Sequence, residues 1–185
     1  MKKALFLLFS IVLVIGFIST AGLSQDNTAK YIGEKKCNIC HKSAKRGNQA
    51  EIWAKGPHAK AYTVLGTDEA KAVAKKAGVE GNPQESPKCL KCHVTAYSEP
   101  ASVKEATLTM DEGVGCETCH GPGSIYKSLK IMKDMYAGTQ DFAAVGALHP
   151  DENTCKKCHN PASPTYKEMN FAEAMKTIAH PVPKN

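Results

Sequence analysis

The sequence predicts a mainly α-helical domain with long loops. The side chains of the domain would not fill its interior. Helical periodicity recurs between turn signals, whereas the alternating patterns typical of strands are scarce. Aromatic residues make up only 6% of the 185 residues, which is few for building the core of a chain of this length. The eight cysteines and most of the seven histidines are concentrated in one short repeated motif. We therefore expect bound cofactors to form most of the core.

The N-terminus has the features of an export signal. Two lysines follow the first residue, an almost purely apolar run covers residues 4–18, and small residues recur over 19–24. This pattern predicts a signal peptide over residues 1–24 and one mature domain over residues 25–185. The apolar run is also about long enough to span a bilayer, so an uncleaved membrane anchor is the alternative. Either form would be exported, to the periplasm or the extracellular space.

Helical patterns follow one another along the mature chain. They cover residues 48–53, 67–78, 124–136 and 170–180. Thr67 and Asn170 are placed to cap the second and the fourth of these helices. Gly78 and Pro181 would end the same two helices. The apolar face of the third helix would consist of Ile125, Leu129, Met132 and Tyr136.

Cysteine pairs separated by two residues, each followed directly by histidine, occur four times. They are Cys37/Cys40 with His41, Cys89/Cys92 with His93, Cys116/Cys119 with His120, and Cys155/Cys158 with His159. Two cysteines three apart lie about one helical turn from each other, so both thiols reach the vinyl groups of one porphyrin. The next residue, histidine, then binds the iron, and C-x-x-C-H predicts this attachment of haem c. We expect four haems, bound through thioethers. Disulfides, zinc sites and iron–sulfur clusters fit the spacing and the trailing histidines less well.

Haem iron has two axial positions, and the histidines are too few to fill all of them. After the four proximal ligands, only His58, His149 and His180 remain. At most three of four haems can therefore have two histidine ligands. We predict His58 and His180 as distal ligands, with His149 and Met132 as further candidates. At least one haem is then open, or it has a ligand other than histidine.

Five stretches resemble the tetrahaem cytochrome c-554 family. They are KKCNICHKS at 35–43, HAKAY at 58–62, CLKCHV at 89–94, GVGCETCHGPG at 113–123 and CKKCHN at 155–160. The resemblance implies a mostly helical fold, haems in closely stacked pairs, and electron transfer. It also implies that His58 is the distal ligand of the haem at His120 and that His180 serves the haem at His159. The haem at His93 would have an open position.

At the first haem the sequence departs from the family. The resemblance implies a distal histidine about ten residues beyond the third motif, but position 130 is lysine. Met132 lies closest to the expected place. The haem at His41 would therefore be ligated by Met132 or by His149, or it would be open. Methionine would raise its reduction potential relative to two histidines.

The motifs and the resemblance predict a carrier of electrons between redox partner proteins. Exposed lysines around the first motif could dock an acidic partner; these are Lys35, Lys36, Lys42 and Lys45. One alternative is a reductase or oxidoreductase that binds a nitrogen oxide or hydroxylamine at an open haem. Another is a subunit of an extracellular cytochrome filament.

The charge of the chain does not indicate nucleic-acid binding. The formal net charge is +6, but haem propionates would reverse its sign. Aromatic and basic residues are not interleaved as they are in single-strand binding proteins. No catalytic residue and no oligomeric state is assigned from the sequence.

Overall fold

The structure, a computed structural model, describes residues 28–183, so the expected signal peptide lies outside the described residues. The α-helices are α2 (Glu34–His41), α3 (Gln49–Lys55), α4 (Ala61–Val64), α5 (Asp68–Lys76), α6 (Pro87–His93), α7 (Cys116–His120), α8 (Leu129–Tyr136), α9 (Glu152–Lys156) and α10 (Phe171–Ile178). Single 3-10 turns lie between them at η1 (Ala44–Arg46), η2 (His58–Lys60), η3 (Pro83–Glu85), η4 (Ala101–Val103), η5 (Met110–Glu112) and η6 (Ala143–Val145). Extended backbone pairs only at an isolated bridge between Tyr31 and Lys104 within residues 28–183. The prediction of a mainly helical chain with long loops is confirmed.

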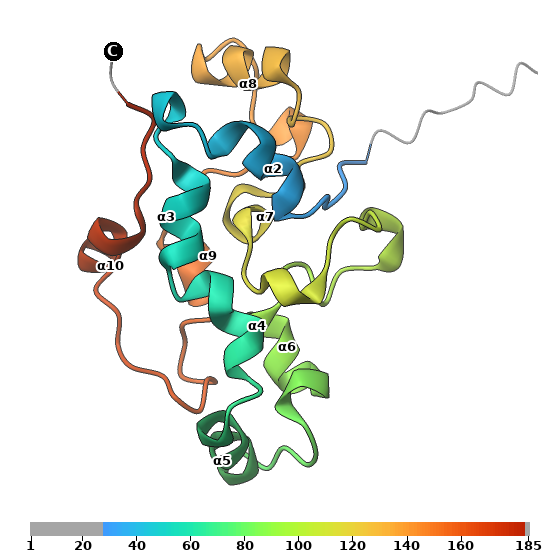
Figure 1. Cartoon of the computed structure of the whole chain (residues 1–185), viewed down its shortest axis with the longest axis vertical. Coiled ribbons are helices and arrows are strands. Elements are labelled where there is room, and N and C mark those ends of the chain that lie inside the picture. Colours follow the sequence, from blue (N-terminus) through green and yellow to red (C-terminus); the bar gives the residue numbers. More distant parts are fainter. Residues whose placement is uncertain (1–27, 184–185) are drawn as a thin grey trace, which may run out of the picture.

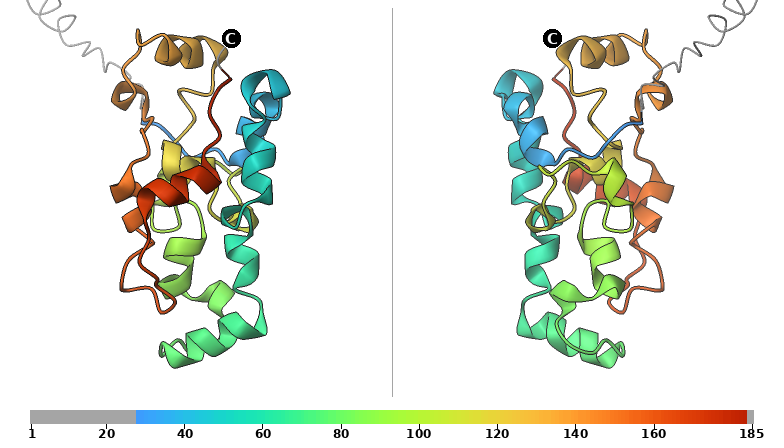
Figure 2. Two further views of the ribbon diagram at one scale, coloured as in Figure 1. Left: turned by 90° about the vertical axis from the view of Figure 1, so that its left-hand side faces the viewer. Right: turned by 90° about the vertical axis from the view of Figure 1, so that its right-hand side faces the viewer.

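Short helices surround the centre of an elongated molecule. Helix α7 lies near the middle (Figure 1), next to α2, and α2 in turn contacts α3. Helices α3 and α4 follow each other along one side (Figure 1). Helix α8 lies at one end and α5 at the other in every view (Figures 1 and 2). None of the helices in this part of the chain is both long and apolar enough to cross a membrane.

Two helix starts agree with the caps predicted from the sequence. The Thr67 hydroxyl accepts a hydrogen bond of 3.2 Å from the backbone N–H of Ala70, at the start of α5. The Asn170 side chain accepts one of 3.2 Å from Glu173 at the start of α10. Gly78 follows the end of α5 with φ +66°, a conformation that glycine adopts without strain.

The predicted helix over 124–136 is shorter in the structure. Helix α8 begins at Leu129, because Ser128 caps it and residues 124–127 form a turn that contains the buried Tyr126 side chain. Its buried face also differs from the prediction. Met132 packs against the core, whereas Leu129 is 50% exposed and Tyr136 is 76% exposed.

The side-chain core of the described residues is small and divided in two. Its clusters consist of Leu65, Leu90 and Val94, and of Tyr126, Val145 and Ala147. The first joins α6 to the end of α4, and the second lies between α8 and η6. So little buried apolar surface agrees with the low aromatic content of the sequence.

Candidate haem sites

The C-x-x-C-H motifs form short helices or helical turns. They coincide with α2, α6 and α7, and the fourth motif begins in α9. In the first three, histidine is the last residue of the helix. In the fourth, α9 ends at Lys156, and the His159 N–H donates to the Cys155 carbonyl over 2.9 Å, which continues the turn. All eight cysteines are free and half-buried, so each pair is available for thioether attachment.

Two contacts between cysteines bring pairs of motifs together in space. A hydrogen bond between the thiols of Cys37 and Cys116 raises the pKa of Cys37 and joins the first motif to the third. Burial and the neighbouring Cys92 raise the pKa of Cys158 to about 12, which joins the second motif to the fourth.

The third and fourth motifs are also neighbours. Burial and, to a smaller extent, the nearby Cys155 raise the pKa of the Cys119 thiol. Taken with the two other cysteine contacts, this gives the spatial order first, third, fourth, second. That order differs from the order along the chain.

Two histidine pairs have the spacing of ligands to a shared metal ion. The ring centroids of His58 and His159 are 6.1 Å apart, with their planes at 77°. Those of His120 and His180 are 6.0 Å apart, at 69°. Because metal–imidazole bonds are about 2 Å long, rings that bind one ion from opposite sides have centroids roughly 6 Å apart. These residues therefore fit an iron with two axial histidines.

The pairs differ from those that the resemblance implied. His58 lies beside the histidine of the fourth motif, and His180 lies beside that of the third. Burial lowers the pKa of His58, and burial with the nearby His180 lowers the pKa of His120 to about 4. Both rings are then neutral near pH 7, which is the form that binds a metal.

Backbone carbonyls orient two of the rings. The Nδ1 of His93 lies 2.6 Å from the carbonyl oxygen of Ala61, and the Nδ1 of His180 lies 2.8 Å from that of Ile178. A carbonyl only accepts hydrogen bonds, so Nδ1 carries the proton in both rings. The other nitrogen, Nε2, is left to bind a metal.

The glycines of GVGCETCHGPG allow close backbone approaches. A Cβ on Gly113, whose φ is +67°, would lie 2.9 Å from the carbonyl oxygen of His58, which accepts a 3.0 Å hydrogen bond from Val114. The third motif thus supports the backbone of His58. A Cβ on Gly121, at φ +80°, would lie 2.2 Å from the carbonyl oxygen of Gly146.

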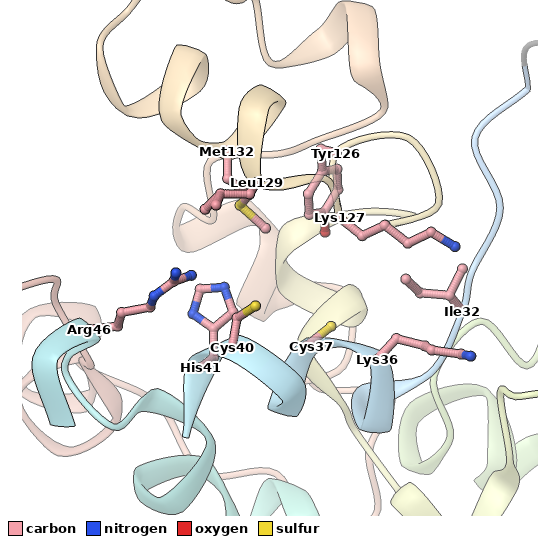
Figure 3. A pocket seen from close by; sticks show the side chains of 11 residues that line it. Ile32, Lys36, Cys37, Cys40, His41, Arg46, Tyr126, Lys127, Leu129 and Met132 are labelled. Carbon is pink, nitrogen blue, oxygen red and sulfur yellow. The ribbon is translucent and has the colours of Figure 1, made fainter. Parts of the chain in front are cut away.

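The first motif faces a cavity in which His41 and Met132 lie on opposite walls (Figure 3). His149 does not line this cavity; its ring stacks on Phe142 with centroids 3.8 Å apart. No histidine ring contacts His41 or His93 in the described part of the chain.

Sequence reasoning missed Glu117, which lies between the cysteines of the third motif. Its side chain is 2% exposed, and its carboxylate accepts hydrogen bonds from the backbone N–H groups of Ile32, Gly33 and Gly123 at 2.6–3.0 Å. Burial raises the pKa of Glu117, and these donors oppose that effect. The flanking glycines, which leave room for a buried carboxylate, were the signal available in the sequence.

Comparison with known proteins identifies similar chains. Residues 36–121 match the family model described as cytochrome c554 and c-prime. Cytochrome c-554 of Nitrosomonas europaea is 32% identical over 144 residues, which cover 76% of this chain. The chain spans 57% of the length of that relative. No solved structure matches the chain significantly.

Proposed function

We propose, because the chain belongs to the cytochrome c554 family, that it is an exported tetrahaem c-type cytochrome that carries electrons between redox partner proteins. Membership of this family implies a multihaem electron carrier in general terms. The number of haems, the ligands of each and the exported location are our proposals. The single observation that carries the tetrahaem assignment is that all four C-x-x-C-H motifs are neighbours in one spatial series.

In this proposal each cysteine pair holds one haem c, and the histidine that follows it binds the iron. His58 is the distal ligand of the fourth haem, which is the haem of His159. His180 is the distal ligand of the third haem, which is the haem of His120. The ring spacings of about 6 Å support both assignments.

Haem c, when bound, supplies an iron that gains and loses one electron reversibly. The chain's own residues set the order of the sites. The hydrogen bonds of Cys37 with Cys116 and of Cys92 with Cys158, and the electrostatic interaction of Cys119 with Cys155, support a series from the first motif through the third and fourth to the second. Electrons would enter or leave at the two ends of this series.

The exposed lysines near the first motif would dock an acidic redox partner. Four lysines in or just after the helix that carries His41 are exposed. Lys35 and Lys36 belong to α2, and Lys42 and Lys45 follow it. Electrostatic docking of this kind is weakened by salt, so the rate of electron exchange with an acidic partner should fall as ionic strength rises.

The proposal is tested by electron paramagnetic resonance of the oxidised full-length protein. Metal analysis and mass should give four haems per chain, and a count other than four would overturn the tetrahaem assignment. His58→Ala and His180→Ala should each convert one haem from low spin to high spin. His149→Ala is the matched control and should convert none.

The ligand pairing is tested in a protein that lacks the fourth haem, made by changing Cys155 and Cys158 to serine. In this background His58→Ala should create no further high-spin haem, whereas His180→Ala should still create one. The opposite result would support the pairing that the family resemblance implies. It would leave the electron-carrier function intact.

A second candidate function is the reduction of a nitrogen oxide or hydroxylamine at the second haem. It is favoured by His93, which a backbone carbonyl orients but which no second histidine ring contacts within residues 28–183. Rapid binding of CO by the fully reduced protein would support an open iron, and turnover with nitric oxide or hydroxylamine would support an enzyme. Absence of CO binding would remove this candidate.

A further inference from the structure

No histidine ring contacts His41 within residues 28–183, and the wall opposite His41 presents the thioether of Met132. The cavity is lined on one side by Cys37, Cys40 and His41 of α2. On the other side it is lined by Tyr126, Leu129 and Met132. The Met132 sulfur points into the cavity, toward the side that carries Cys40 and His41 (Figure 3).

We propose that Met132 is the sixth ligand of the first haem, opposite His41. This inference rests on the proposed tetrahaem function. Thioether sulfur is an established axial ligand of haem iron, and it accompanies histidine in many c-type cytochromes.

The other histidines are placed elsewhere. His58 and His180 each lie against the histidine of another motif. His149 stacks on Phe142 and does not line the cavity. A histidine ligand for the first haem would therefore require one of these contacts to break.

The nitrogen-bearing side chains at the cavity are poorer ligands than Met132. Arg46 is the one arginine in the sequence, and its guanidinium stays protonated, so it cannot bind iron. Lys36 and Lys127 extend away from His41, toward Ile32 (Figure 3). Arg46 instead suits a carboxylate such as a haem propionate at the edge of this cavity.

Helix α8 is held in a way that keeps Met132 at the cavity. Ser128 caps the helix by accepting a 3.3 Å hydrogen bond from Ile131. Met132 and Met135 both pack against the cluster of Tyr126, but only Met132 also lines the cavity. Met135 is therefore the matched control for a methionine that serves packing alone.

This ligand would set the first haem apart from the others. A histidine–methionine pair raises the reduction potential relative to two histidines. The first motif is also one end of the spatial series of motifs. An electron that enters from the second motif would therefore come to rest at the first, beside the exposed lysines of α2.

The test uses the full-length holoprotein with four variants. The oxidised wild type should show the near-infrared charge-transfer band of methionine-ligated ferric haem. Met132→Leu should abolish the band and add one high-spin haem, whereas Met135→Leu should leave both unchanged. Met132→His should lack the band but restore a low-spin haem, with a lower potential than in the wild type. His149→Ala should retain the band.

Two results would overturn the inference: absence of the band from the wild type, or its persistence in Met132→Leu. Failure of the broader function is recognised separately. A protein that holds four haems and keeps its His58 and His180 haems low-spin, but lacks the band, remains the proposed carrier without this ligand. A protein with fewer than four haems would contradict the tetrahaem function on which this inference rests.

Discussion

Replacement of Glu117 by alanine should destabilise the protein more than the loss of any surface carboxylate. The carboxylate accepts backbone hydrogen bonds from Ile32 and Gly33, which precede α2, and from Gly123, which follows α7. It therefore joins the segment that leads into the first motif to the loop that follows the third. Alanine would leave these buried N–H groups without an acceptor.

The magnitude follows from the number of donors. Each buried N–H left unsatisfied costs about 1–3 kcal/mol, so three donors give a gross cost of about 3–9 kcal/mol. Relief of the unfavourable burial of the carboxylate, which raises the pKa of Glu117, offsets part of this cost. We expect a net loss near the lower end, about 3 kcal/mol, which is a large share of the 5–15 kcal/mol stability of a typical domain.

Urea denaturation of the oxidised holoprotein measures this loss, with far-UV circular dichroism and Soret absorbance as two probes. With a typical slope of about 1–3 kcal/mol per molar urea, the midpoint should fall by about 1–3 M. Glu117→Gln retains one acceptor oxygen, so its urea midpoint should fall less than that of Glu117→Ala. Glu152→Ala is the matched control, because Glu152 is exposed and its ion pair with Lys156, at 3.0 Å, contributes about 0–1 kcal/mol. If Glu117→Ala and Glu152→Ala share one midpoint, the carboxylate does not join the two motifs as argued.

Two further predictions concern pH and backbone clearance. Burial raises the pKa of Glu112 from 4.5 to about 7, so the folded state holds a proton that the unfolded state releases, and stability should decline as pH rises from about 5 to about 8. Urea midpoints across this range should show a decline that Glu112→Gln reduces, and an unchanged slope in that variant would contradict the assignment. Gly121→Ala should destabilise the protein more than Gly138→Ala. Both positions have positive φ, +80° and +71°, but only at Gly121 would the new methyl group clash with another group, the carbonyl of Gly146. Thermal unfolding of the two variant holoproteins compares their stability. Equal melting temperatures would show that the loop around Gly121 shifts to accommodate the methyl group.

Local features could be predicted from the sequence because they depend on residues that are close in the chain. The caps at Thr67 and Asn170 need only a side-chain oxygen and a backbone N–H a few residues later, and the structure has both. The start of α8 could not be predicted in this way. Tyr126 has helical spacing with its neighbours, yet its hydroxyl donates to the carbonyl of Gly121 over 2.7 Å, and this keeps the preceding turn out of the helix.

Glu117 shows the same limit at the candidate site. From the sequence, an acidic residue inside a haem motif is expected to be exposed, because carboxylates are seldom buried. Its donors include Ile32 and Gly33, more than 80 residues away in the sequence, so the reason for its burial exists only in the folded chain.

The sequence alone determined which residues are candidates for attaching haem and that seven histidines are too few to give four irons two ligands each, since adjacency in C-x-x-C-H and a count of histidines require no fold. Which histidine faces which motif was decided by tertiary structure. His58 meets His159 and His180 meets His120 because segments about 60 to 100 residues apart in the chain lie close together, and no local pattern encodes such an approach. The same packing brings Met132 to the wall opposite His41, which turns a residue of an apolar helix face into a candidate ligand.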